Sequence, residues 1–329
     1  MNAAHGPMKA LARLSLHRLG ILQALFWYHR NSFQILTYHR FSDMQGIDIA
    51  GVLRRQFSYI RKHFHPVSVS QVQRALSGEA TLPPRALAIT VDDGYRDFLS
   101  VAFPLFREYE LPVTVYLISD FIDGRLWPWW DELEYALQRT TKPYFEDGLA
   151  AGSQHRRLPL SSDAERQTAY AELCLALTRV PNRTRLAVLE RLPQTLAVDL
   201  PASAPPQYAA LTWDEIRILK NAGVEFGGHT TTHPILTSLE DAQTVYGEVA
   251  ESKRRIEEEL QCPVTHFAYP NGDFNDTVVA AVKRCGFLSA ATVLSGSCST
   301  STDPYLLKRR SIELDFSDDY FREMLAGVH

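Results

Sequence analysis

The stretch Leu87-Ala88-Ile89-Thr90-Val91-Asp92-Asp93-Gly94 places two carboxylates and a glycine directly after five apolar or β-branched residues. The apolar run predicts a buried strand, and Asp-Asp-Gly predicts the turn at its end. Ligands of parallel α/β proteins bind at the carboxyl ends of strands, so both carboxylates are candidates for a functional role. Taken alone, however, the stretch is explained as well by a turn and a helix cap.

Short β-like runs alternate with helix-like runs on both sides of this stretch, from Phe33 onward, and this alternation predicts a parallel α/β architecture. The predicted strands are Gln34–Tyr38, Pro66–Val69, Ala86–Val91, Pro112–Ile118, Val224–Gly227, Thr265–Tyr269, Leu288–Thr292 and Leu307–Ile312. The predicted helices are Trp213–Asn221 after the cap Thr212, Leu239–Leu260 after Ser238, Thr277–Cys285 and Asp318–Leu325.

The alternation stops between Trp127 and Ala210, where an aromatic cluster leads into helix-like stretches without obvious strands. We expect a mainly helical insertion at about 127–210 within a barrel domain of residues 33–329. Residues 1–32 are expected to form an amphipathic helical extension, because leucines recur at helical spacing among polar residues in Lys9–Tyr28. The lack of an apolar segment and a cleavage site argues against an export signal. A basic amphipathic helix of this kind could make peripheral contact with a membrane.

The composition narrows the class of protein. The 329 residues carry a formal net charge of −4, without the basic surplus of nucleic-acid-binding proteins, so no nucleic-acid partner is expected. The four cysteines are widely spaced, which favours free thiols over a disulfide framework or a zinc knuckle. No stretch has the roughly 20 apolar residues of a spanning helix. We expect a cytoplasmic location with membrane association left open, and no pattern indicates an oligomeric state.

A second group of polar residues, Gly227-Gly228-His229-Thr230-Thr231-Thr232-His233, also follows a short apolar strand. On a helical turn, residues four apart share a face and could bind one metal ion. Two imidazole nitrogens and one carboxylate would leave coordination positions open for water and substrate, as a hydrolytic metal site requires.

A third strand end carries Tyr269, Pro270 and Asn271. The proline restricts the backbone, so the turn could present Tyr269 and the Asn271 amide to a cleft. A Pro-Asn-Gly turn with a core tyrosine explains the same residues.

Together and in this order, the three strand ends resemble the polysaccharide deacetylase family, also called the NodB-homology or carbohydrate esterase family 4 group. Thr90–Gly94 is similar to its T-F-D-D-G motif, with Val91 in place of Phe, and His229–His233 is similar to its H-[ST]-x-x-H motif. The resemblance covers roughly Ile35 to Ile312. It implies a distorted (β/α) barrel with fewer than eight strands.

The resemblance also implies roles for the residues of these motifs. Asp92 corresponds to the general base, and Asp93, His229 and His233 correspond to the ligands of one divalent metal ion. Zinc is the first expectation, and cobalt or nickel would also suit these ligands. The implied reaction removes an acetyl group from an N-acetylated sugar, with the metal and the amide of Asn271 stabilising the oxyanion.

One family residue is missing from the third motif, R-x-x-P-Y, because Ala268 stands where its arginine would orient the catalytic Asp. Arg309 or Arg310, on the predicted last strand, could supply the guanidinium, and Arg310 is the candidate.

The family's late L-x-x-H motif, whose histidine protonates the leaving amine, is also missing. After His266 the chain has no histidine except the terminal His329. His39, which follows the first predicted strand, resembles the Tyr-His motif of a subgroup that carries this histidine near the N-terminus. We expect His39 to be the acid, and a structural histidine beside Tyr38 is the alternative.

Two other functions remain open. The first is a catalytically silent carbohydrate-binding protein that keeps the barrel and the metal, and the second is a hydrolase of a non-sugar amide. Trp127, Trp129 and Trp130 favour a sugar slightly, because aromatic faces stack on pyranose rings, although they would serve equally well as core residues. The expected location favours a lipid-linked or nucleotide-linked glycan precursor as substrate.

Overall fold

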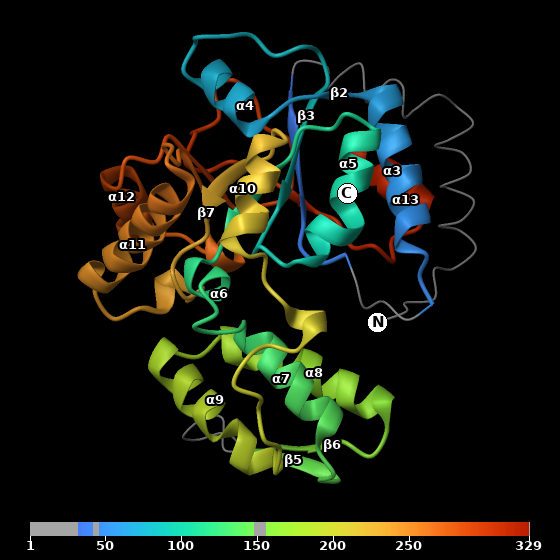
Figure 1. Ribbon diagram of the computed structural model, residues 1–329, viewed down its shortest axis with the longest axis vertical. Coiled ribbons are helices and arrows are strands. Elements are labelled where there is room, and N and C mark those ends of the chain that lie inside the picture. The colour runs from blue at the N-terminus through green and yellow to red at the C-terminus, as the bar shows by residue number, and fades with distance from the viewer. Residues whose placement is uncertain (1–31, 42–45, 148–155, 329) are drawn as a thin grey trace.

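The computed structural model describes residues 32–41, 46–147 and 156–328. Strands and helices alternate in its larger part, and helices predominate in a smaller part that contains α7, α8 and α9 (Figure 1). The expected N-terminal helix within residues 1–32 lies outside the described residues. None of the described helices combines the length and the apolar composition needed to cross a membrane.

The central sheet has seven parallel strands along one path, in the order β10-β1-β3-β4-β7-β8-β9. These seven strands are one fewer than the eight that surround a complete (β/α)8 barrel, so the predicted distorted barrel with fewer than eight strands is confirmed. The strands are β1 (Gln34–Tyr38), β3 (Ala86–Val91), β4 (Thr114–Leu117), β7 (Glu225–Gly228), β8 (His266–Ala268), β9 (Ser289–Ala291) and β10 (Arg310–Ser311). An eighth strand of the sheet, β2 (His65–Pro66), pairs with the start of β3 off this path.

The segment from Leu307 to Ile312 connects the two ends of this path. Leu307 forms a parallel bridge with Ala291 at the end of β9, and Arg310 pairs with Leu36 of β1. The Ile312 amide also donates to the Thr37 carbonyl at 2.9 Å. This segment therefore closes the barrel and places Arg309 between its first and last strands.

Amphipathic helices pack their apolar faces on the sheet and form the main core with it. They are α3 (Ile49–His63), α5 (Phe103–Glu108), α6 (Ser119–Ile122), α10 (Trp213–Asn221), α11 (Ala242–Leu260), α12 (Asp276–Arg284) and α13 (Asp318–Leu325). Helix α4 (Val69–Leu76) packs instead in a separate buried cluster with residues of β1 and β3. Helix α13 lies beside α3 (Figure 1). Short helical turns η1 (Phe98–Ala102), η3 (Leu236–Ser238) and η4 (Pro270–Gly272) complete this part.

Three predicted boundaries are wrong by three residues. The expected strand Leu307–Ile312 is shorter, because regular pairing with β1 is limited to β10 (Arg310–Ser311). In the other two, a capping residue outweighs the apolar pattern. The expected strand Pro66–Val69 ends at Pro66, since Ser68 and Gln71 form a capping box that starts α4 at Val69. The expected helix Leu239–Leu260 starts at Ala242, because the Asp241 side chain accepts from the Thr244 amide and caps it there.

The segment predicted as an insertion contains α7 (Trp129–Arg139), α8 (Asp163–Thr178), α9 (Asn182–Leu196) and the turn η2 (Pro206–Tyr208). These helices enclose a core of their own. The expectation that the segment has no strands is wrong, since β5 (Tyr144–Asp147) and β6 (Arg156–Pro159) pair as an antiparallel hairpin. Its strands have four residues each, and only Phe145 among Tyr144, Phe145 and Glu146 is buried, which is too short an alternation to recognise.

The four cysteines are free thiols, as predicted. Cys298 is buried, and the other three are half-buried.

Candidate active site

The polar groups that follow β1, β3, β7 and β8 meet at one end of the barrel, because the carboxyl ends of parallel strands share an edge. They surround a pocket of about 420 Å³. The predicted site residues that line it are His39, Asp92, Asp93, His229, His233, Tyr269 and Asn271.

The loop that carries the two histidines is not helical, although a helical turn is what we expected from their spacing. His229 follows β7 directly, and the chain then runs through a turn in which Thr230 has φ +67° and His233 has φ +56°. A left-handed β-branched residue is strained by about 1–3 kcal/mol. The Thr230 hydroxyl accepts from the His233 amide at 3.0 Å and stabilises the turn. The loop, rather than a helix, therefore brings both rings to the same carboxylate.

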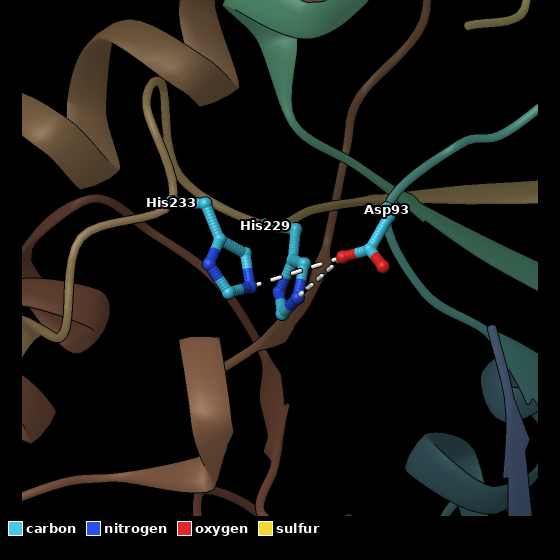
Figure 2. A group of neighbouring side chains, drawn as sticks. All are labelled: Asp93, His229 and His233. Atoms are coloured by element: carbon cyan, nitrogen blue, oxygen red, sulfur yellow. Dashed lines mark ion pairs between the residues drawn. The ribbon is translucent and has the colours of Figure 1, made fainter. Parts of the chain in front are cut away.

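Asp93, His229 and His233 form a buried group that could hold a metal ion. Asp93 Oδ1 lies 3.5 Å from His229 Nε2 and 3.8 Å from His233 Nε2, and both rings face the carboxylate (Figure 2). Tetrahedral zinc with bonds of 2.0–2.1 Å would separate its ligand atoms by roughly 3.3 Å. The observed spacing fits one ion with small adjustments.

The protonation states of this group also suit a cation. Burial lowers the pKa of His229 to about 4 and lowers the pKa of His233 well below its usual value, so both imidazoles are neutral and free to act as ligands. Burial and the neighbouring Asp92 raise the pKa of Asp93 well above its usual value. A bound dication would offset this cost of burying a negative charge.

Asp92 forms a buried bidentate ion pair with Arg309. The guanidinium Nη1 lies 2.7 Å from Asp92 Oδ1, and Nη2 lies 2.8 Å from Oδ2. The same side chain donates to the hydroxyls of Thr37 and Thr90 and to the carbonyl of Thr292. Burial alone would raise the pKa of Asp92, but the Arg309 charge holds it well below its usual range, so the carboxylate is ionised.

The candidate Arg310 is therefore wrong, because its neighbour Arg309 makes the contact with Asp92. Successive residues of an extended chain point to opposite faces. Arg309 points into the barrel. Arg310 interacts electrostatically with Tyr320 of α13 and not with Asp92. No local pattern separates the two arginines. The pairing of the closing segment with β1 decides which one faces inward.

His39 lies at the pocket as expected, with its Nε2 3.8 Å from Asp92 Oδ2. Its side chain is 44% exposed, which leaves the ring open to solvent and substrate. The position is compatible with proton transfer, and its role as the acid stays a prediction.

The third strand end has a packing function as well as a place at the pocket. Tyr269 is buried between the rings of Phe267 and Phe274, and its hydroxyl donates to the Tyr305 carbonyl at 3.1 Å. Pro270 starts η4, and Asn271 has φ +53° and lines the pocket. The use of the Asn271 amide as an oxyanion donor also stays a prediction.

Eight further residues line the pocket that the motifs did not indicate: Arg40, Tyr95, Trp130, Glu134, Val293, Ile312, Glu313 and Leu314. Two of them adjoin motif residues, since Arg40 follows His39 and Tyr95 follows Gly94. Trp130 and Glu134 belong to the insertion. The aromatic cluster had drawn attention to Trp130 in the sequence, but nothing there places it beside the metal ligands.

The fold and the site together place this chain among the α/β-barrel proteins that carry a candidate metal site. Its buried Asp-His-His group lies at the carboxyl ends of the strands. The family model described as "Polysaccharide deacetylase" matches residues 79–180 and 192–290, which together are more than half of the chain. The chain belongs to the polysaccharide deacetylase family, and the resemblance seen in the sequence is confirmed.

Individual relatives match shorter stretches or only the fold. The chain is 29% identical over 112 residues to poly-beta-1,6-N-acetyl-D-glucosamine N-deacetylase of Escherichia coli O157:H7, covering 32% of this chain and 16% of that protein. The Streptococcus pyogenes deacetylase PplD in complex with acetate has a TM-score of 0.58 at 18% identity, over 89% of this chain and 98% of that chain. IcaB from Ammonifex degensii has a TM-score of 0.56 at 14% identity, over 90% of this chain and 96% of that chain. Both structures share the fold of this chain.

Proposed function

We propose that this protein is a metal-dependent deacetylase that removes N-acetyl groups from an N-acetylated sugar in a glycan or glycan precursor. The observation that carries the proposal is the joining of two buried groups in one pocket. Asp93, His229 and His233 could hold a divalent ion, and the adjacent Asp92 is an ionised carboxylate oriented by Arg309. The polysaccharide deacetylase family of this chain and the name of the Escherichia coli relative support a sugar of the N-acetylglucosamine type.

Zinc is the proposed ion, and cobalt or nickel would suit the same three ligands. When bound, the ion would polarise the acetamide carbonyl and lower the pKa of an attacking water molecule. The chain's own residues would supply the remaining steps. Three protein ligands leave positions open for water and substrate, as catalytic metal sites require.

Asp92 is positioned to act as the base. Arg309 fixes both of its oxygens, and each oxygen keeps a further lone pair. Asp92 would take a proton from the attacking water, and the Asn271 amide would donate to the oxyanion that forms on the acetyl carbonyl.

The amine must be protonated to leave, and His39 is placed to do so. As the carbon–nitrogen bond breaks, the sugar nitrogen would receive a proton from His39 Nε2, while the acetyl group leaves as acetate. Because the ring is 44% exposed, it can be protonated again from solvent.

The catalytically silent alternative rested on the missing motif arginine. The bidentate contact of Arg309 with Asp92 removes that reason for preferring it. A hydrolase of a non-sugar amide would use the same groups, and substrate comparison separates it from the proposal.

The test is acetate release from N-acetylglucosamine oligomers by the full chain. We expect activity to disappear after chelation and to return with zinc, cobalt or nickel. Asp92→Asn should lose at least about 100-fold in kcat while the metal stays bound, since general-base catalysis contributes roughly 10²–10⁴-fold. Undiminished acetate release by Asp92→Asn, or by the chelated protein, would contradict the mechanism. Release only from non-sugar amides would favour the alternative substrate.

A further inference from the structure

We propose that Trp130, on the insertion helix α7, is a positioning residue for His233, so that the insertion completes the metal centre. The inference rests on the proposed metal site and goes beyond it, because it assigns a function to a segment outside the barrel.

The two imidazole rings are held in different ways. His229 donates from Nδ1 to the Ala268 carbonyl at 2.7 Å, which directs its Nε2 toward Asp93. His233 Nδ1 is buried and has no hydrogen-bond partner from another described residue. A metal-binding histidine normally donates its second nitrogen to an acceptor that fixes the ring. The orientation of the His233 ring therefore depends on something else.

Packing takes the place of that hydrogen bond. The Trp130 ring contacts the His233 ring with their centroids 4.7 Å apart and their planes at 70°. The His229 ring contacts it at the same centroid distance, with an angle of 73°. His229 is itself a proposed ligand, so Trp130 is the contact that comes from outside the metal group.

Trp130 is itself held by a chain of hydrogen bonds. Its Nε1 donates to the Tyr95 hydroxyl at 2.9 Å, and that hydroxyl donates to Asp131 Oδ2 at 2.6 Å. Asp131 is the next residue of α7, is 1% exposed, and pairs with Arg40 at 3.4 Å. Arg40 also donates to the Gln207 carbonyl at 2.8 Å.

This chain connects the insertion to the loops that carry the site. Tyr95 lies two residues after Asp93, and Arg40 directly follows His39. The loop that supplies the carboxylate ligand therefore also fixes the indole that supports the second histidine. A side chain locked by packing and hydrogen bonds in this way can hold a ligand in a productive geometry.

Metal affinity is the readout that tests the inference, because it does not require turnover. The metal-free full chain is titrated with zinc against a chromophoric competing chelator, and the absorption spectrum of the cobalt form reports the coordination. We expect Trp130→Ala to bind zinc about 10–100-fold more weakly than the parent, which is the usual loss when support of a metal ligand is removed. Trp130→Phe keeps a ring against His233 and should keep most of the affinity.

Trp213→Ala is the matched control. Trp213 is also partly buried and its indole nitrogen donates to Asp123 at 2.7 Å, but it is not among the residues that line the pocket. The same substitution there should leave zinc affinity and the cobalt spectrum unchanged, which separates support of His233 from a general effect of losing an indole.

Tyr95→Phe provides a second variant if Trp130→Ala does not fold. It removes the hydroxyl that holds the indole, keeps the ring, and should also weaken zinc binding and alter the cobalt spectrum. A folded Trp130→Ala or Tyr95→Phe protein with the zinc affinity and cobalt spectrum of the parent would overturn this inference and leave the proposed function standing. Failure of the parent to bind any of these ions would overturn the proposed function and, with it, this inference.

Discussion

Among the described residues, Arg309 alone lies within hydrogen-bond distance of the Asp92 carboxylate, and the contacts give the cost of removing it in Arg309→Met. Two bonds of 2.7 and 2.8 Å are lost, and both side chains are at most 3% exposed. Removing one member of a buried pair leaves an uncompensated charge, which costs about 3–5 kcal/mol. With an unfolding entropy of about 0.7 kcal/mol/K for a chain of 329 residues, a loss of about 4 kcal/mol would lower the thermal unfolding midpoint by roughly 6 °C.

Arg310→Met is the matched control, since Arg310 is the adjacent buried arginine and does not contact Asp92. Thermal unfolding and urea unfolding are both followed by circular dichroism with chelator present, so that metal binding does not contribute. In the Arg309→Met protein, the additional change Asp92→Asn should recover a large part of the loss, because a neutral amide is cheaper to bury than an unpaired carboxylate. An equal loss of unfolding free energy in the two arginine variants, or no recovery of it in the double variant, would show that the ion pair of Arg309 with Asp92 does not stabilise the fold.

Three further outcomes are expected. His39→Gln should lower kcat for N-acetylated sugars by about 10²–10⁴-fold and spare aryl acetates, whose leaving group needs no proton; equal losses on both substrates would exclude the acid role. Burial raises the pKa of Asp131 to about 7, above its unfolded value near 3.9, so its contribution to stability is full below pH 4 and is lost as the pH rises toward 7. Relative to Asp131→Asn, the parent should therefore lose stability over that range in denaturant unfolding, and parallel pH profiles would contradict the shift. His233→Gln should reduce bound zinc measured by elemental analysis, while a control at the exposed Thr232, Thr232→Ser, should keep it.

The parts of the fold set by local signals could be predicted from the sequence. The helix at Trp213 begins where the capping box of Thr212 and Glu215 places it, and both of its ends agree with the prediction. The three polar strand ends were also located to within one residue, because an apolar run that stops at charged residues, glycines or a proline turn is a short-range pattern.

The parts of the fold and of the site that depend on long-range geometry could not be predicted from the sequence. Arg309 and Arg310 are equivalent in the local sequence, and only the pairing of the closing segment with β1 decides which one meets Asp92. The left-handed turns at Thr230 and His233 replace the helical turn that the histidine spacing suggested. Trp130 reaches His233 through the placement of the whole insertion, which no motif encodes.

The central claim is that Asp93, His229 and His233 hold the ion on which deacetylation depends. The most direct measurement is bound metal and acetate release determined together, on the same preparations of the parent and of Asp93→Asn. We expect about one ion per parent chain, and we expect Asp93→Asn to lose both the ion and acetate release although its circular dichroism is unchanged. A folded Asp93→Asn protein that releases acetate at the parent rate, or a metal-free parent that does so, would contradict it.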